Sequence, residues 1–188
     1  MSRNELVQAC LRNDKDARHQ LIEQHYGYLM GMCRRYTKNN LQAETFFNEA
    51  FKDVFKHLSE YKDDENLDAW IKRTVVKSLV SQLKNNRTEY YVTTTTRIDD
   101  RKPQGVDLFH ETEEQDLNQL RAEDYVRILQ RIPASFRAIY NLVVIDELPL
   151  KDAAAILEVS EESARNTIER ARFEFSKNVK MYLQGYNG

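Results

Sequence analysis

Apolar residues recur every three or four positions along the first half of the chain, which is the spacing of amphipathic helices. Four such stretches are predicted to be helices: residues 4–12, 16–36, 42–58 and 67–85. The apolar face of the second contains Leu21, Tyr28, Leu29 and Met32, and that of the third contains Phe47, Phe51, Val54, Phe55 and Leu58. Each helix therefore has one face to bury, and we expect the four to pack as a compact bundle.

The second half of the chain repeats the helical pattern after a stretch that lacks it. Residues 93–111 contain four consecutive threonines and few apolar side chains, which is typical of a flexible linker. Thr112 and Gln115 match a capping box, so a helix is predicted to begin there and to carry Leu117, Leu120, Tyr125, Ile128 and Leu129. Pro133 is placed to start the next helix.

A helix, a tight turn and a second helix are predicted next. One apolar face comprises Leu150, Ala153, Ala154 and Leu157, and after a break at residues 158–160 it resumes at Ala164, Ile168 and Ala171. Ser160 is suited to cap the second helix. Arg165, Asn166, Arg170 and Arg172 avoid the apolar stripe, so they are available to phosphates and base edges. The pattern indicates a DNA-binding helix-turn-helix, although a helical hairpin with a solvated charged face fits the same spacing.

The net charge of −2 is unusual for a nucleic-acid-binding protein, but the charge is unevenly distributed. Residues 1–92 have 15 basic and 13 acidic side chains, residues 93–120 have 3 and 7, and residues 121–188 have 10 of each. Residues 69–88 hold basic and no acidic side chains: Lys72, Arg73, Lys77, Lys84 and Arg87. The sequence thus predicts an all-α protein with a helical bundle over residues 1–92 and a helix-turn-helix domain over residues 112–188. A flexible acidic linker, residues 93–111, joins them.

The fourth predicted helix has a basic and an apolar side. The basic side carries Arg73, Lys77, Ser81 and Lys84, and the apolar side carries Ile71, Val75, Leu79 and Leu83. One side can pack on the bundle while the other meets a phosphate backbone. Trp70 and the preceding Tyr61 are candidates to stack on unpaired bases. A lone Trp beside an apolar stripe is more often an anchor of the core, so that alternative for Trp70 stays open.

Other function classes find little support in the sequence. The four histidines have no metal-ligand spacing, and no glycine-rich phosphate loop or nucleophile elbow is present. We therefore expect neither an enzyme nor a bound metal, cofactor or small-molecule substrate. Cys10 and Cys33 form no CxxC pair and are expected to be buried thiols. No apolar stretch is long enough to span a bilayer, so the sequence predicts a cytoplasmic protein without membrane insertion.

Two stretches of the chain match conserved regions of one family. The first is AETFFNEAFKDVFKHL followed by DAWIKRTVVKSLVSQLKNN, and the second runs from RIPASFRAIYNLVV through LEVSEESARNTIERAR. They resemble the second and fourth regions of the sigma-70 family of bacterial transcription initiation factors, in its small two-domain form, the extracytoplasmic function group. The resemblance implies a sigma factor that binds core RNA polymerase and promoter DNA and directs promoter-specific transcription initiation.

The resemblance also implies roles for individual residues. Residues 43–58 correspond to the helix that docks on the clamp coiled coil of core polymerase, which makes Glu44, Asn48, Glu49 and Lys52 candidate core contacts. These four also fit the solvated face of an amphipathic helix. Residues 69–85 and the loop before them correspond to the part that binds the minus-ten element. The helix that begins at Ser160 corresponds to the part that reads the minus-thirty-five element. The expected DNA contacts are Tyr61, Trp70, Lys72, Arg73, Lys77, Ser81, Lys84, Ser160, Glu162, Ser163, Arg165, Asn166, Arg170 and Arg172.

The chain departs from the family pattern at several positions. Lys77 and Ser81 stand where the family usually has Asn and Asp. Glu158 replaces the usual Gly of the turn, and because a non-Gly residue at positive φ costs on the order of 1 kcal/mol, a differently shaped turn is expected. Glu162 also replaces a Gly, so the reading helix begins acidic and its autonomous affinity for DNA is expected to be low.

Two alternatives stay open on the sequence alone. A stand-alone helix-turn-helix regulator would explain the C-terminal half but leave the basic helix at residues 67–85 without a role. A sigma-like decoy, which binds polymerase or a regulator without initiating, would fit the departures at Lys77, Ser81 and Glu158. No sensory domain is visible, so a signal is expected to act through expression level or through a partner such as an anti-sigma protein.

Overall fold

The computed structural model describes residues 2–62, 64–86, 90 and 118–185. These residues form helices and no strand, so the all-α prediction is confirmed. The chain divides into two compact units, Met1–Gln82 and Leu83–Gly188, and the division falls in the last turn of a helix. The predicted linker at residues 93–111 and the predicted capping box at Thr112 and Gln115 lie outside the described residues, so the predicted domain boundaries stay predictions.

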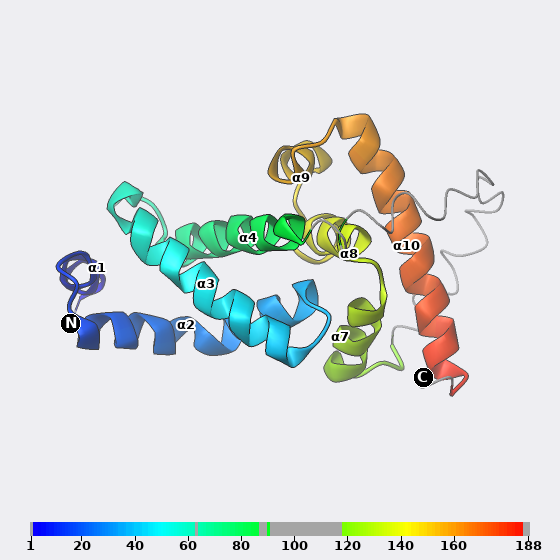
Figure 1. The fold of residues 1–188 in the computed structure, drawn as a ribbon, viewed down its shortest axis with the longest axis horizontal. Coiled ribbons are helices and arrows are strands. Elements are labelled where there is room, and N and C mark those ends of the chain that lie inside the picture. The colour runs from blue at the N-terminus through cyan, green and yellow to red at the C-terminus, as the bar shows by residue number, and fades with distance from the viewer. Residues whose placement is uncertain (1, 63, 87–89, 91–117, 186–188) are drawn as a thin grey trace. The chain divides into compact units, whose positions relative to one another are not determined.

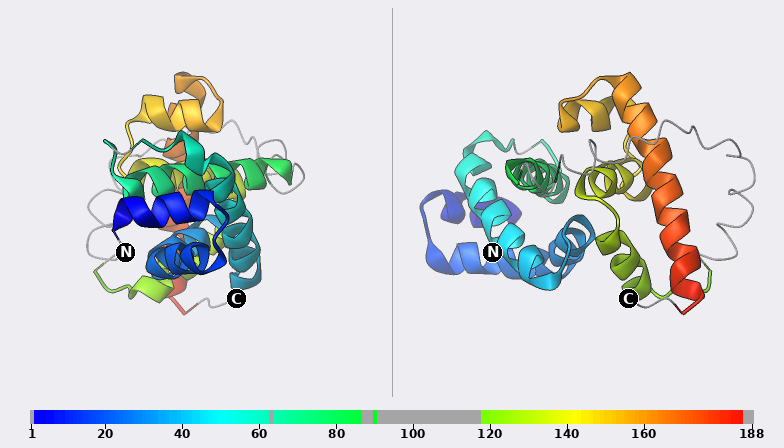
Figure 2. Two further views of the ribbon diagram at one scale, coloured as in Figure 1. Left: turned by 90° about the vertical axis from the view of Figure 1, so that its left-hand side faces the viewer. Right: turned by 45° about the vertical axis from the view of Figure 1, so that its right-hand side comes forward.

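The N-terminal unit is a helical bundle. Its elements are α1 (Arg3–Leu11), α2 (Lys15–Tyr36), α3 (Asn40–His57), a 3-10 turn (Leu58–Glu60) and α4 (Leu67–Asn85). Ser2, Asp14 and Asn39 cap the first three helices, because their side-chain oxygens accept backbone N–H groups of the first turn. Figures 1 and 2 show α1 lying across the start of α2, and α2 and α3 side by side. No predicted helix boundary in this unit is wrong by more than two residues.

The core of this unit contains most of the apolar residues that the sequence indicates. Leu21, Leu29, Met32, Phe47, Phe51, Val54 and Leu58 are all buried. Phe55 is half-buried, whereas Tyr28 is 57% exposed. Tyr28 lies about 100° around the helix from Leu29, beyond the buried stripe, so its assignment to the apolar face is wrong. Cys10 and Cys33 are buried free thiols, as expected.

The C-terminal unit is built along one long helix. Its elements are α7 (Ala122–Arg131), α8 (Ala134–Tyr140), a π-helical turn (Asn141–Ile145), α9 (Leu150–Leu157) and α10 (Glu161–Leu183). Figure 1 shows α7, α8 and α9 arranged along α10, which contacts all three. The ring of Phe175 on α10 stacks on Tyr140 with centroids 4.6 Å apart and lies 4.9 Å from the ring of Tyr125. These aromatic contacts fix α7 and α8 against the C-terminal half of α10.

The start of α7 differs from the prediction. A helix was expected to run through Leu120, but residues 118–121 form a turn and extended chain, so that part of the prediction is wrong. The Asp124 carboxylate accepts the backbone N–H of Arg121 at 3.1 Å and thereby starts the helix locally at Ala122. The Tyr182 hydroxyl on α10 donates to the other oxygen of Asp124 at 2.5 Å. A carboxylate held from a distant helix sets this boundary.

A buried arginine closes the other end of α7. Arg137 on α8 is 2% exposed, and its guanidinium donates to the backbone carbonyls of Gln130 at 3.1 Å and Ile132 at 3.3 Å. These carbonyls belong to the last turn of α7 and the residue that follows it, where the helix supplies no donor of its own. Arg137 therefore joins α7 to α8, and its role is to stabilise the fold.

Candidate nucleic-acid and polymerase interface

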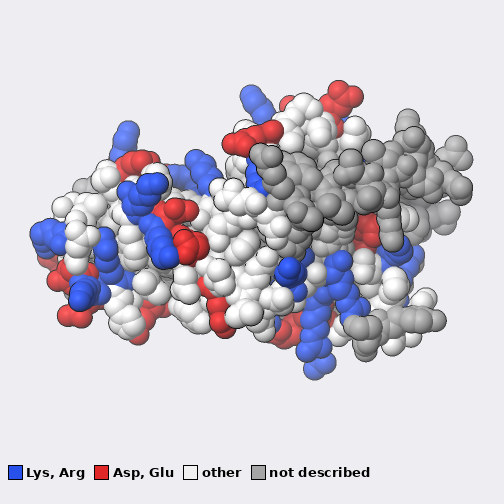
Figure 3. All heavy atoms as spheres, in the orientation of Figure 1, with Lys and Arg blue, Asp and Glu red and all other residues white. Residues whose placement is uncertain are grey.

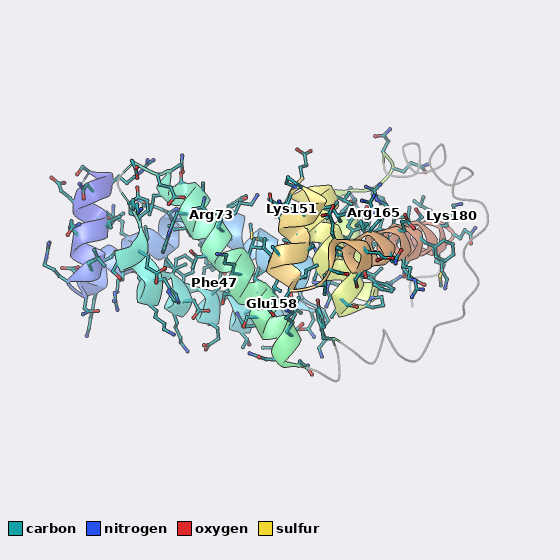
Figure 4. All side chains as sticks on the ribbon, turned by 90° about the horizontal axis from the view of Figure 1, so that it is seen from above. Phe47, Arg73, Lys151, Glu158, Arg165 and Lys180 are labelled. Atoms are coloured by element: carbon teal, nitrogen blue, oxygen red, sulfur yellow. The ribbon has the colours of Figure 1, made fainter. Side chains whose placement is uncertain are left out.

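The turn between α9 and α10 is well defined despite its lack of glycine. Glu158 adopts φ 54° and ψ 44°, the left-handed conformation. The backbone N–H of Val159 donates to Ala154 O at 3.1 Å and that of Glu158 to Ala155 O at 3.2 Å, which is the hydrogen-bond pattern of a Schellman motif. The turn thus keeps the shape that favours glycine, and the expectation of a different turn is wrong. Figure 4 shows Lys151 at the start of α9 and Glu158 at its end.

Ser160 starts α10 as predicted. Its hydroxyl accepts the backbone N–H of Ser163 at 3.1 Å. Ala153 on α9 and Ala164 and Ala171 on α10 are fully buried, so small side chains let the helices of this unit pack closely. The backbone contacts and caps fix the direction in which the first turns of α10 project.

The exposed side of α10 forms a shallow hollow beside α8. It is lined by Phe136, Ser160, Glu162, Ser163, Asn166, Thr167 and Arg170. Five of the predicted DNA contacts are in this set, so the structure brings Ser160, Glu162, Ser163, Asn166 and Arg170 together. Phe136 and Thr167, which also line the hollow, are not among the predicted DNA contacts. The Thr167 hydroxyl donates to Ser163 O at 2.7 Å.

Arg165 and Arg172 are exposed but do not line the hollow. They are seven residues apart, about two helical turns, and therefore share a flank of α10. Arg165 lies 4.0 Å from the carboxylate of Glu161, one turn before it. The predicted DNA contacts of this helix thus divide into a set that lines the hollow and a pair of arginines on the flank. Arg165 of this pair is labelled in Figure 4.

The basic side of α4 is exposed, but it is not free of acid. Arg73, Lys77 and Ser81 are exposed, and Lys72 and Lys84 are half-buried. Glu65, from the loop before the helix, forms an ion pair with Arg73. Over the N-terminal unit, Figure 3 shows basic and acidic side chains interspersed. Residues 69–88 contain no acidic side chain, but the fold brings one from outside this stretch next to Arg73.

The loop that precedes α4 is fixed by its own hydrogen bonds. The Tyr61 hydroxyl donates to Glu65 O at 2.8 Å, and Asn66 caps α4 by accepting the N–H of Ala69 at 3.1 Å. The rings of Tyr61 and Trp70 meet edge to face with centroids 5.9 Å apart. Trp70 is 7% exposed, so it is an anchor of the core, which was the alternative to a base-stacking role. Tyr61 is half-buried and retains part of its ring at the surface.

The four candidate polymerase contacts lie on one exposed side of α3. Glu44, Asn48, Glu49 and Lys52 are exposed, whereas Ala43, Phe47, Ala50 and Val54 on the opposite side are buried. The Lys52 ammonium lies 2.5 Å from the Glu49 carboxylate. Phe47 anchors the buried side through contacts with Tyr26 of α2 and Phe51, at centroid distances of 5.2 and 4.9 Å.

A polar cluster between α3 and α4 was not indicated by the sequence. The hydroxyl of Ser78, which is 5% exposed, donates to the Asp53 carboxylate at 2.5 Å. The Gln82 amide donates to Ser78 Oγ and to Phe46 O, both at 3.2 Å. Ser78 and Gln82 are one turn apart on α4, a spacing that could have identified them only if the position of α3 were known. The cluster fixes the helix with the candidate polymerase contacts against the basic helix.

The described part of the chain contains neither a metal-binding cluster nor a membrane-spanning helix. There, no group of three or more His, Cys, Asp or Glu side chains is arranged to hold a metal ion. Within the same residues, no helix has both the length and the apolar character required to cross a bilayer.

Two family models match the chain. The model described as Sigma-70 region 2 matches residues 21–89, and the model described as Sigma-70, region 4 matches residues 122–172. The first range contains the exposed sides of α3 and α4, and the second contains the helix-turn-helix. Both regions occur in the order that the sequence predicts.

The chain is similar over nearly its whole length to two sigma factors. RNA polymerase sigma-H factor of Pseudomonas aeruginosa is 21% identical over 183 residues, which cover 96% of this chain and 95% of the relative. ECF RNA polymerase sigma factor SigW of Bacillus subtilis is 20% identical over 179 residues, which cover 90% and 92%. A solved structure of CnrH in complex with the cytosolic domain of CnrY has 17% identity and a TM-score of 0.46 over 97% of each chain.

These matches decide among the interpretations that the sequence left open. A stand-alone regulator would have no use for region 2, and neither it nor a decoy is favoured by two matched regions and by relatives that are sigma factors. The chain belongs to the sigma-70 family, in its extracytoplasmic function group, and is a sigma factor that directs promoter-specific transcription initiation by core RNA polymerase.

Proposed function

We propose that the two units divide promoter recognition between them, and that α3 holds the protein on the polymerase. Glu44, Asn48, Glu49 and Lys52 are the proposed contacts to the clamp coiled coil of the core enzyme. The support for this assignment is their common exposure on one side of a helix whose other side is buried. The single observation that carries the whole proposal is the presence of both sigma regions in one chain.

The second part of the proposal concerns the minus-ten element. Lys72, Arg73, Lys77, Ser81 and Lys84 contact its phosphates, and the loop before α4 holds the unpaired non-template strand. Stacking falls to Tyr61, whose ring is partly exposed, while Trp70 supports that ring from the core. Base stacking on an aromatic ring offsets about 1–3 kcal/mol of the cost of unpairing, so opening the duplex needs no covalent chemistry by the protein.

The third part concerns the minus-thirty-five element, which the first turns of α10 read in the major groove. Ser160, Glu162, Ser163, Asn166 and Arg170 face the base edges, since they line one hollow. Glu162 accepts from cytosine amino groups, a normal pairing for a carboxylate. Arg165 and Arg172, on the flank, contact phosphates.

The charge of the C-terminal unit bears on how it binds. Residues 121–188 have equal numbers of acidic and basic side chains. Since phosphate neutralisation supplies most non-specific affinity for DNA, the unit by itself binds duplex weakly and depends on attachment to polymerase. Linker residues 93–111, which lie outside the described residues, are proposed to run toward the RNA exit path.

Regulation and location complete the proposal. An anti-sigma protein that covers one or both DNA-facing surfaces would hold the factor inactive, since each surface is needed for initiation. The protein acts in the cytoplasm, where core polymerase and the chromosome are, and contributes binding energy in place of catalysis.

Run-off transcription with purified core enzyme and genomic templates tests the proposal. We expect discrete transcripts that require both this protein and core, with core alone as the control. If core binds the protein but no discrete transcript forms, the decoy interpretation holds. If nothing co-purifies with core, a stand-alone regulator is the better description.

A further inference from the structure

Leu41 is an apolar side chain on an otherwise polar surface. It is 74% exposed, the highest value among the large hydrophobic side chains of the described residues. It lies in the first turn of α3, four, seven and eleven residues before Thr45, Asn48 and Lys52. At helical spacing these positions form one row, about 16 Å long, on the side opposite the buried residues.

The fold does not require an apolar residue at this position. Polar caps fix the start of α3: Asn39 accepts the N–H of Gln42 at 2.9 Å, and Gln42 accepts the N–H of Lys38 at 2.9 Å. The preceding Thr37 is fully buried and donates to Cys33 O at 2.8 Å. Leu41 takes no part in these side-chain contacts, and every other exposed residue of its row is polar.

The same caps make Leu41 a preorganised contact. The backbone on both sides of the α2–α3 turn is hydrogen-bonded, so binding through Leu41 orders one short side chain only. An apolar side chain on a rigid helix favours binding when a partner covers it, because it loses its contact with water and little conformational entropy is lost.

We propose that Leu41 is an apolar anchor for core RNA polymerase, inserted into an apolar pocket of the surface on which α3 docks. This inference rests on the proposed function, because the partner is the one proposed there for Glu44, Asn48, Glu49 and Lys52. It extends that surface by one turn toward the start of α3, to a residue that neither charge nor family resemblance indicates.

Binding of the full chain to purified core enzyme, measured as a dissociation constant, tests the inference. Leu41→Ala is expected to weaken binding about tenfold, the effect of truncating an interface anchor. Leu41→Met, which keeps most of the apolar surface, is expected to stay within about threefold of the natural protein. Leu11→Ala is the matched control, since Leu11 is an exposed leucine on α1, and its affinity should not change.

Asn48→Ala separates failure of the inference from failure of the proposed function. If it weakens core binding while Leu41→Ala does not, Leu41 is no anchor although α3 is the docking helix. If the natural chain does not bind core at all, the proposed function fails together with the inference. If Leu41→Ala abolishes self-association in sedimentation and leaves core affinity unchanged, a second copy is the occupant and the inference is overturned.

Discussion

Glu158 concentrates the backbone strain of the helix-turn-helix in one residue. With φ at 54°, its backbone is in the left-handed region, where the Cβ atom of any residue other than glycine has a steric cost. The turn persists because the Schellman hydrogen bonds, the buried Ala153 and Ala154 and the Ser160 cap all require it. The strained residue that precedes α10, the helix with the candidate DNA contacts, is therefore maintained by its surroundings.

Glu158→Gly is expected to stabilise the protein by about 1 kcal/mol relative to Glu158→Ala. Both variants lack the carboxylate, so their difference isolates the backbone conformation. The measurement is the free energy of unfolding from urea titrations followed by circular dichroism. Equal stability of the two variants would show that the turn relaxes and carries no strain.

At the scale of elements, α10 acts as the frame of the C-terminal unit. Its first turns carry the candidate DNA contacts, and its far end fixes α7 through Tyr182 and Asp124. The Tyr182 hydroxyl, helped by the backbone N–H of Arg121, holds the pKa of Asp124 below its ordinary value. One helix thus carries the candidate DNA contacts near its start and fixes the start of α7 near its end.

This contact predicts a pH dependence of stability. A carboxyl whose folded pKa is lowered stabilises the fold above its unfolded pKa of about 4, and that contribution is lost as the pH falls through the lower folded value. Tyr182→Phe should therefore be less stable than the natural protein at neutral pH, and the difference should shrink below about pH 4. Urea titrations at several pH values measure it, and a difference that does not depend on pH would exclude this role of Asp124.

At the scale of the whole molecule, the proposed polymerase contacts and the proposed contacts to the minus-thirty-five element lie on different helices. The proposed polymerase contacts on α3 lie within the match to Sigma-70 region 2, and the hollow lined by residues of α8 and α10 lies within the match to region 4. A change in one surface should leave the function of the other intact.

Replacement of both Arg165 and Asn166 by Ala is expected to reduce use of the minus-thirty-five element about tenfold while core binding is unchanged. Comparing transcription from templates with and without that element measures the first quantity, and co-purification with core measures the second. Arg127→Ala, at an exposed arginine of α7, is the matched control. Loss of core binding in the double variant would contradict the proposed division.

The sequence by itself determined the helices of the N-terminal unit, the cap at Ser160 and the family. Both ends of α4 and the cap at Ser160 follow from periodicity and short-range hydrogen bonding, which act within a few residues. Tertiary structure alone decided the burial of Trp70, the exposure of Tyr28, the pairing of Arg73 with Glu65, and the start of α7. Each of these depends on which atoms another element or loop brings near, and the spacing of residues along one helix does not contain that information.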